Sequence, residues 1–505
     1  MSASVAQHAF TAKDVLNNEK KSALKANVTL YSLMEKAGLA VFKEIYSLNV
    51  RRKKVLVVCG KGNNGGDGFV IARLAAEAGF DVETIILATE HSLASDALKA
   101  FKALKQYSTS VQFIEDDIQL QTCIKAINLT APEIIVDAIF GIGFRGKLPE
   151  MHTTLIDNLN TLSAIKIAID VPSGVDASSG HVIDTAFEAD QTVSFIAQKR
   201  GLYTGQAVNF TGEIKLKTLN LTETFCQVSQ ANHFLQTRQN LPSLVKRKKS
   251  IHKGDIGLLL AIGGNVGFSG AIKLASTAAL RSGSALVSVV SHQQSQFLVH
   301  SQTPELMNAG MNTDELVNNT YLMKAKQVLI GPGLGQDLWA QDVFNFALSL
   351  NKPLVIDADG LNLLSKTPQY RNNWVLTPHP GEAARLLNCT VDDIELDRFA
   401  AVEKICKKYG GICVLKGAGT LISDGNDFWI NTSGNPSMAS GGMGDVLSGI
   451  IAAHLLQMND KLTAVRLAVF LHGYIADNLV NEQGEIGLLA SDIVANIPKY
   501  INKII

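Results

Sequence analysis

The stretch Val55-Leu-Val-Val-Cys-Gly-Lys-Gly-Asn-Asn-Gly-Gly-Asp67 joins a short apolar run to a glycine-rich turn, and a helical pattern over 69–79 follows it. A run that is apolar throughout, rather than alternating, is typical of a strand buried on both faces of a parallel sheet. The helical pattern ends at Gly79, a residue type that often closes helices. The stretch therefore predicts a strand, a turn and a helix in succession.

The same order of elements recurs along the chain. Leu258-Leu-Leu-Ala-Ile262 is followed by a second glycine-rich turn and by a helical pattern over 271–281. Strands that alternate with helices predict an α/β fold with parallel sheets. Further short, mostly apolar runs lie at 82–87, 133–136, 166–169, 328–330, 353–356 and 412–415.

The length of 505 residues exceeds what one hydrophobic core usually organises, so at least two domains are expected. A polar stretch over about 220–250 interrupts the alternation of strands and helices. We therefore expect an N-terminal domain over 1–225, a linker region over 226–250 and a second domain over 251–505.

Bulk properties limit the class of protein. Lys and Arg number 46, as do Asp and Glu, so no net charge recruits nucleic acid or an anionic membrane. The six cysteines form no CxxC pair, which suits a reducing cytosol better than a disulfide framework. No secretory signal or long apolar span is recognisable. We expect a soluble cytoplasmic protein without a nucleic-acid or membrane partner.

Polar residues follow several of the predicted strands in the first half. Gly60-Lys-Gly-Asn-Asn-Gly65 matches GxGxxG, a weak signal that by itself also fits a structural turn. No acidic residue ends the next strand to bind a ribose, which disfavours ordinary NAD-dependent hydride transfer. Asp137 and Asp170 each follow a further strand, and either alone could simply cap a turn. Because ligands collect at the carboxyl ends of parallel strands, the three turns together favour one binding crevice.

These residues resemble the N-terminal domain of the bifunctional NAD(P)H-hydrate repair enzymes, from Tyr31-Ser-Leu-Met-Glu-Lys-Ala-Gly38 to about Gly212. The resemblance implies a Rossmann-like three-layer αβα domain that interconverts the R and S epimers of hydrated NADH and NADPH. It also implies that two segments bind the hydrated dinucleotide. They are Asn63, Asn64, Gly65, Gly66 and Asp67, and Gly141, Ile142, Gly143, Phe144, Arg145, Gly146 and Lys147.

The same resemblance implies a potassium ion held by Asn64, Asp137 and Ser173, whose oxygen atoms suit a hard cation. It places Asp170 against the substrate near the reacting centre. A carboxylate is a reasonable general acid or base for epimerisation, so Asp170 is the first catalytic candidate of this half.

The second half carries a stronger pattern. Asn435-Pro-Ser-Met-Ala-Ser-Gly-Gly-Met-Gly-Asp445 leads into an apolar segment over 446–456. Glycines at a helix start can present N–H donors to a phosphoryl group, and an aspartate there can accept a proton from a hydroxyl. The alternative is an N-cap aspartate, which would not require so many small residues before it. The pattern favours a nucleotide-phosphate site at Asp445.

This pattern resembles the ribokinase-like superfamily and, within it, the ADP-dependent NAD(P)H-hydrate dehydratases. The motifs that match in order are His252-Lys-Gly-Asp255, Gly263-Gly-Asn265, Gly331-Pro-Gly-Leu-Gly335, Asp357-Ala-Asp-Gly-Leu-Asn362 and Thr377-Pro-His-Pro-Gly-Glu382. The resemblance implies a ribokinase-like α/β domain that uses ADP and Mg²⁺.

Residue roles follow from the same resemblance. Ala271, Gly333, His379 and Asp445 would line the hydrated nicotinamide pocket, although His379 taken alone would more often be structural. Asp445 would be the catalytic base. The expected ADP-binding residues are Lys416, Gly417, Ala418, Gly419, Thr420, Asn435, Pro436, Ser437, Met438, Ala439, Ser440, Gly441, Gly442, Met443 and Gly444.

The sequence thus predicts a bifunctional enzyme, expected to be a homo-oligomer, that epimerises NAD(P)H-hydrate and dehydrates its S form with ADP. Two alternatives stay open. A kinase of a vitamin-like alcohol would prefer ATP and release a stable phosphorylated product. The first half as a scaffold in RNA handling would show a degraded site, whereas Asn64, Asp67, Asp137, Asp170 and Ser173 are all present.

Overall fold

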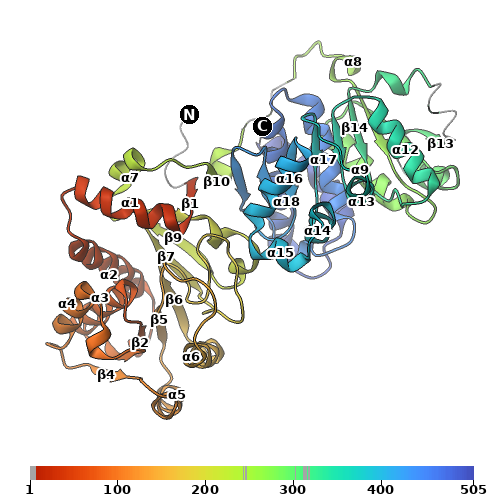
Figure 1. The fold of residues 1–505 in the computed structure, drawn as a ribbon. Helices are drawn as coiled ribbons and strands as arrows, with labels where there is room; N and C mark the ends of the chain where they lie inside the picture. Colours follow the sequence, from red (N-terminus) through yellow and green to blue (C-terminus); the bar gives the residue numbers. More distant parts are fainter. Residues whose placement is uncertain are drawn as a thin grey trace. The chain divides into compact units, whose positions relative to one another are not determined.

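The computed structural model describes residues 7–242, 244, 247–301, 303–310, 316 and 319–504. The chain divides into two compact units, Met1–His233 and Phe234–Ile505, and each is described by itself (Figure 1). The division falls inside the expected linker region 226–250, of which 243, 245 and 246 lie outside the described residues. This region contains regular structure, namely the end of α7 (Thr222–Val228), β10 (His233–Gln236) and the 3₁₀ turn η5 (Arg238–Asn240).

The first unit is built on a seven-stranded sheet in the order β4-β3-β2-β5-β6-β7-β9. All its strand pairs are parallel. A separate short parallel pair joins β1 (His8–Phe10) to β8 (Gln198–Lys199). The strands of the sheet are β2 (Lys54–Cys59), β3 (Asp81–Ile86), β4 (Ser110–Phe113), β5 (Ile134–Ala138), β6 (Ile165–Ile169), β7 (Gln191–Phe195) and β9 (Glu213–Lys217).

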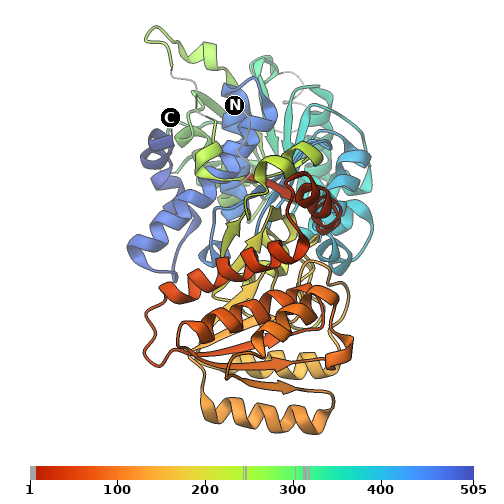
Figure 2. The ribbon, with the colours of Figure 1, turned by 90° about the vertical axis from the view of Figure 1, so that its left-hand side faces the viewer.

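Helices cover both faces of this sheet (Figures 1 and 2). Val57 of β2 packs into one apolar core with Phe69 and Phe101, whereas the neighbouring Val58 packs into another with Leu155. Alternate residues of one strand therefore enter opposite cores, as the uniformly apolar run predicts. The helices are α1 (Ala12–Lys25), α2 (Leu30–Ser47), α3 (Asn63–Glu77), α4 (Ser95–Leu104), α5 (Asp117–Thr130) and α6 (Glu150–Thr161).

One boundary differs from the sequence prediction. The helix expected over 69–79 begins at Asn63, so the Asn-Asn-Gly-Gly-Asp motif forms its first turns and not a preceding loop. Packing explains why glycines stand there. A Cβ on Gly65 would lie 1.9 Å from the carbonyl oxygen of Gly60, which follows β2 directly. The absent side chain thus allows α3 to start against the end of the strand.

The second unit contains a sheet in the order β13-β12-β11-β14-β15-β16-β17-β18-β19, with β10 beside β19. The pairs from β13 to β17 are parallel, and β18 and β19 are antiparallel. The predicted α/β architecture is confirmed in both units. The strands are β11 (Leu258–Ile262), β12 (Leu286–Ser291), β13 (Met307–Gly310), β14 (Gln327–Ile330), β15 (Leu354–Ile356), β16 (Trp374–Leu376), β17 (Ile412–Leu415), β18 (Leu421–Ser423) and β19 (Phe428–Asn431).

Two helices of this unit touch almost backbone to backbone. A Cβ on Gly449 of α17 would lie 2.0 Å from the carbonyl oxygen of Ala275 on α9, so this contact fixes where α17 runs. The α-helices are α8 (Lys253–Ile256), α9 (Ser269–Arg281), α10 (Gln296–His300), α12 (Leu338–Ser349), α13 (Ala358–Lys366), α14 (Pro380–Leu387), α15 (Val391–Leu396), α16 (Arg398–Tyr409), α17 (Met443–Gln457), α18 (Lys461–Gln483) and α19 (Ala490–Ile504).

Short 3₁₀ turns connect several elements. They are η2 (Glu90–Ser92), η3 (Arg200–Tyr203), η4 (Gly205–Asn209), η6 (Gln293–Ser295), η7 (Leu322–Lys324) and η8 (Pro436–Met438). Within the described part of the chain, no helix has both the length and the hydropathy that a bilayer crossing requires.

Candidate functional site

A cavity of about 750 Å³ lies in the first unit at the carboxyl ends of the central strands. It brings together turns that are far apart in the sequence, as the sheet order predicts. Gly65 and Gly66, by contrast, are buried in α3, and Gly146 and the buried Asp137 and Ser173 do not line the cavity. The expected residues that line it are Asn63, Asn64, Asp67, Gly141, Ile142, Gly143, Phe144, Arg145, Lys147 and Asp170.

The three expected potassium ligands are linked through the backbone of Phe140. Ser173 donates from its N–H and its hydroxyl to the carboxylate of Asp137, at 2.7 and 2.6 Å. The N–H of Phe140 donates to Ser173 Oγ at 2.9 Å, and Asn64 Nδ2 donates to the carbonyl oxygen of Phe140 at 3.0 Å. Asn64 Oδ1 has no hydrogen-bond donor among the described residues and faces Gly141.

This cluster fits a hard monovalent cation. Its donors are carboxylate, hydroxyl, amide and carbonyl oxygens, with no sulfur or imidazole. Burial raises the pKa of Asp137 to about 6, although its hydrogen bonds with Ser173 oppose the shift. A bound cation would compensate that buried charge. Among the described residues no group of three or more His, Cys, Asp or Glu could hold a metal, and only one of these three ligands is acidic.

Asp170 is the first residue after β6, and its backbone is left-handed, with φ +66°. Its Oδ1 accepts from the N–H of Phe195 at 3.0 Å and from Lys199 Nζ at 2.5 Å. The side chain of Lys199 is 1% exposed. Lys199 is not among the residues predicted from the sequence, where the one signal for it is a lysine shortly after a buried strand.

Asp67 lies in the same cavity but is bonded differently. Within the part of the chain that the structure describes, its carboxyl group has no hydrogen-bond partner. Burial raises the pKa of Asp67 well above its ordinary value, and the charges of Asp170 and Glu19 raise it further. Burial and Asp170 likewise raise the pKa of Glu19, on α1. Three carboxyl groups therefore crowd one cavity.

The segment from Gly141 to Lys147 carries two basic side chains at the cavity. Arg145 Nη1 donates to the carbonyl oxygen of Phe144 at 2.6 Å, and its Nε lies 3.3 Å from Asp176. Lys147 Nζ lies 2.8 Å from Asp184. Both side chains remain largely exposed. They are therefore placed where they can meet an anionic ligand.

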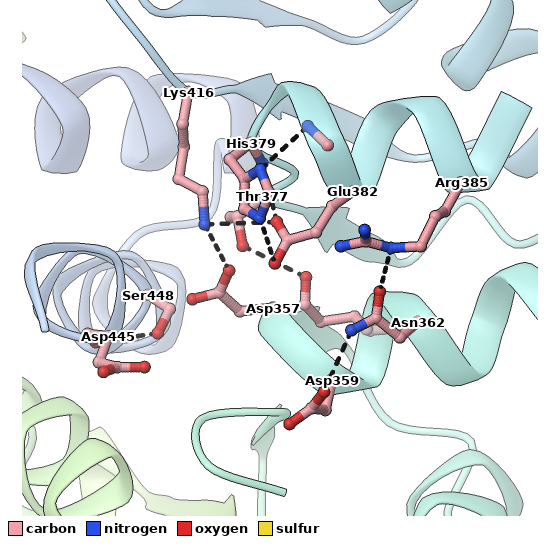
Figure 3. A network of polar contacts seen from close by, with 12 residues as sticks. Asp357, Asp359, Asn362, Thr377, His379, Glu382, Arg385, Lys416, Asp445 and Ser448 are labelled. Carbon is pink, nitrogen blue, oxygen red and sulfur yellow. Dashed lines mark hydrogen bonds and ion pairs between the residues drawn. The ribbon is translucent and has the colours of Figure 1, made fainter. Parts of the chain in front are cut away.

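In the second unit, ionisable residues follow three neighbouring parallel strands (Figure 3). Asp357 follows β15, Glu382 lies on α14 after β16, and Lys416 follows β17. Lys416 Nζ is 2.8 Å from Asp357 Oδ1 and 3.7 Å from Glu382 Oε2. Burial alone would lower the pKa of Lys416, but Asp357 and Glu382 outweigh it and raise that pKa. Asp357 and Glu382 lie within sequence motifs that match the dehydratases, but the motifs alone predict no role for either acid.

Asp445 is the third residue of α17, whose N-cap is Gly442 with φ +89°. The N-cap alternative for Asp445 is therefore wrong. Burial first, and then the charge of Asp357, raise the pKa of Asp445 to about 7, while Lys416 opposes the shift. A Cβ on Gly444 would lie 3.3 Å from Lys416 Nζ, so that ammonium group lies against the start of α17. A carboxyl group that titrates near neutral pH suits a general base.

The two segments expected to bind ADP are anchored by residues that the sequence analysis does not name. Buried Arg398 donates to the carbonyl oxygen of Lys416 at 2.9 Å, at the start of the first segment. Asp477 on α18 accepts from Asn435 Nδ2 at 2.9 Å and from the N–H of Gly434 at 3.0 Å, at the start of the second. Both anchors come from elements distant in the sequence, which explains why no local pattern indicates them.

The residues expected around the nicotinamide lie in two places in the second unit. A Cβ on Gly333 would lie 3.1 Å from the Cβ of Ala271, so these two residues are neighbours. His379 is the N-cap of α14: its Nδ1 accepts from the N–H of Gly381 at 3.0 Å. Its Nε2 lies 3.4 Å from Glu382 Oε1, and the side chain is half-exposed. His379 therefore has a structural role and is also accessible.

Comparison with known proteins agrees with this organisation. A family model described as NAD(P)H-hydrate dehydratase matches residues 259–499, and one described as YjeF-related protein N-terminus matches residues 30–201. The bifunctional NAD(P)H-hydrate repair enzyme of Coxiella burnetii is 39% identical over 96% of this chain and 97% of its own. The enzyme of that name from Escherichia coli is 38% identical over 99% of this chain and 95% of its own.

A solved structure adds support for the fold of the second unit. A ribokinase-like superfamily protein from Enterococcus faecalis is 31% identical, with a TM-score of 0.51, and the match covers 54% of this chain and 96% of that one. Full-length similarity to the repair enzymes, together with both family models, leads to one assignment. The chain belongs to the family of bifunctional NAD(P)H-hydrate repair enzymes.

Proposed function

We propose that this chain repairs hydrated NADH and NADPH by two reactions. The first unit interconverts the R and S epimers at C6, and the second removes water from the S epimer with ADP, giving NAD(P)H, AMP and phosphate. The observation that carries the proposal is Asp445, an acid with a pKa near 7 at the first turn of α17, beside Lys416 and between two glycine-rich segments.

The dehydration follows from the poor leaving ability of hydroxide. Asp445 accepts the proton of the C6 hydroxyl while the hydroxyl oxygen attacks the β-phosphorus of ADP, and AMP leaves. The phosphate ester formed is a better leaving group, and the lone pair on the ring nitrogen expels it as phosphate. Loss of a ring proton then restores the reduced nicotinamide. The N–H groups from Gly441 to Gly444 would stabilise the transferring phosphoryl group.

The nucleotide would be held by the segments 416–420 and 435–444, with the hydrated ring near Ala271, Gly333 and His379. Mg²⁺ would neutralise phosphate charge, and Asp357 and Glu382 offer the carboxylate oxygens that it prefers. These two acids and Asp445 together outnumber the cations Lys416 and Arg385, so a divalent ion fits the local charge.

In the first unit the 750 Å³ cavity would hold the hydrated dinucleotide, with Asp170 at the reacting ring. Potassium would be held by Asn64, Asp137 and Ser173 and would stabilise the turn after β5. A homo-oligomeric state and a cytoplasmic location stay predictions.

Product analysis tests the proposal. The full-length protein is incubated with S-hydrate and ADP, and phosphorus NMR follows the products. We expect AMP and free phosphate in equal amounts, with one NAD(P)H for each. A phosphorylated nucleotide that accumulates without NAD(P)H would instead indicate a kinase.

A further inference from the structure

The carboxyl groups in the cavity of the first unit are not equivalent. Asp170 is bonded to a buried lysine, whereas Asp67 has no partner among the described residues. Two acids in one pocket with such different surroundings commonly take different protonation states and different catalytic roles. The acidic groups that share the cavity with Asp67 are Glu19 on α1, Asp96 on α4 and Asp170 after β6, and the thiol of Cys59 on β2 adjoins it. The basic groups that line the cavity are Lys20, Lys61, Arg145, Lys147 and Lys199.

Lys199 has no hydrogen left for a substrate. Its ammonium group donates to Asp170 Oδ1 at 2.5 Å, to Ser194 Oγ at 3.0 Å and to the carbonyl oxygen of Phe195 at 2.6 Å. These three acceptors use all three of its N–H bonds. Lys199 therefore acts on Asp170 and not on a bound ligand.

The ion pair leaves one oxygen of Asp170 available. Oδ1 accepts from Lys199 and from the N–H of Phe195, while Oδ2 has no donor within the described chain. Asp170 also lines the cavity. A cation in contact favours the ionised carboxylate. The arrangement presents Oδ2 as a fixed base.

Asp67 shows the opposite environment. It lies on α3 in the same cavity, and the charges that act on it most strongly are those of Asp170 and Glu19. Among the described residues it forms no ion pair. Burial and two like charges both favour the neutral acid. Asp67 thus keeps a proton that it can donate.

We infer that Asp170 and Asp67 form a base–acid pair for epimerisation, and that Lys199 is the positioning residue that assigns the base role to Asp170. This inference rests on the proposed function of the first unit. It adds a catalytic role for Asp67 and a positioning role for Lys199.

The step balances without any further reactant. C6 of the hydrate carries a hydroxyl group and is bonded to the ring nitrogen. Asp170 takes the hydroxyl proton, the C6–N bond breaks, and a carbonyl forms at C6. The nitrogen receives the electron pair and the proton of Asp67. After rotation about the C5–C6 bond, nitrogen attacks the other carbonyl face. Asp170 then returns its proton to the C6 oxygen, and the nitrogen gives its proton back to Asp67.

The test follows R/S interconversion of purified R-hydrate by chromatography, without ADP, using the full chain. Asp67→Asn is expected to lower kcat for epimerisation by about 100-fold or more, as for loss of a general acid. Asp157→Asn, which removes an exposed carboxyl group on α6 outside the cavity, is the matched control and should keep wild-type kcat. ADP-dependent dehydration of S-hydrate by each variant checks that the chain is folded.

Lys199→Met tests the positioning role, with Lys43→Met, an exposed lysine on α2 outside the cavity, as its control. The substitution removes the ammonium group that holds Asp170 Oδ1, so kcat for epimerisation should fall about tenfold while KM for R-hydrate stays close to the wild-type value. The double variant Lys199→Met/Asp170→Asn should be no slower than Asp170→Asn alone, because Lys199 acts through that group.

The outcomes distinguish the failure of the proposed function from the failure of the base–acid pair. A wild-type chain that does not interconvert R and S contradicts the proposed function itself. Wild-type interconversion with undiminished kcat in Asp67→Asn, or with undiminished kcat in Lys199→Met, overturns the base–acid pair alone.

Discussion

Lys416 Nζ lies 2.8 Å from Asp357 Oδ1. This ion pair joins the residues that directly follow two parallel strands, β17 and β15. Asp357 is 1% exposed, so the pair is shielded from solvent. The same ammonium group lies against Gly444, one residue before Asp445. Lys416 thereby connects one segment expected to bind ADP to the proposed base.

Substitution of Lys416 should affect the base and the nucleotide together. Lys416→Met removes the group that lowers the pKa of Asp445, so the pH midpoint of dehydration should move above its wild-type value. KM for ADP should also rise. Steady-state dehydration across pH measures both, and Lys404→Met, on the exposed side of α16, is the control. A midpoint unchanged in Lys416→Met would contradict the electrostatic link.

Dehydration should depend on pH through Asp445. Burial and Asp357 raise the pKa of that carboxyl group to about 7, and a general base acts only when ionised. kcat/KM for S-hydrate should therefore be constant above neutral pH and should fall about tenfold per unit below it. The profile is measured in buffers of constant ionic strength. Activity that persists unchanged at pH about 5 would mean that another group is the base.

Asp445→Asn should abolish most of the dehydration and spare epimerisation. The amide keeps the shape of the side chain but accepts no proton, and loss of a general base costs about 100-fold to 10,000-fold in rate. Initial rates of NAD(P)H formation are compared with R/S interconversion in the same preparation. A parallel loss of both activities would point to misfolding and not to chemistry.

Asp477 should matter for nucleotide affinity. It accepts hydrogen bonds from Asn435 and Gly434, which begin the glycine-rich segment. Asp477→Ala removes a charged acceptor worth about 2 kcal/mol and should raise KM for ADP by about tenfold or more. Asp460→Ala, at the start of the same helix, removes a cap distant from this segment and serves as the control. Equal KM values in the two variants would argue against the anchor.

Potassium should stabilise the first unit selectively. KCl is expected to raise the Tm of the full chain above that in choline chloride at equal ionic strength, because binding to the folded state alone stabilises it. Asn64→Ala should remove this difference in Tm. Asn63→Ala is the control and should keep the difference, since Asn63 is not among the expected ligands. A potassium effect of the same size in Asn64→Ala would exclude Asn64 from the site.

Much of this architecture could be predicted because both sheets are mainly parallel and buried. The apolar runs at β2, β5 and β11 mark strands covered on both faces, and the glycine-rich or aspartate-containing turn at the end of each run marks the ligand edge. The helix start at Asn63 was missed, because glycines typical of a loop here permit contact between α3 and Gly60. Side-chain partnerships were also missed. The pairing of Lys199 with Asp170 depends on β8 returning to the end of β6, which no local pattern encodes.

The central claim is that two active sites in one chain act in sequence on the two epimers. A mixed R/S hydrate is supplied with ADP, and the recovery of reduced-nicotinamide absorbance is followed in the wild type and in Asp170→Asn. We predict full recovery in the wild type. In Asp170→Asn the S fraction should recover at the wild-type rate and the R fraction slowly. No recovery in the wild type, or equal slowing of both phases in the variant, would contradict the account.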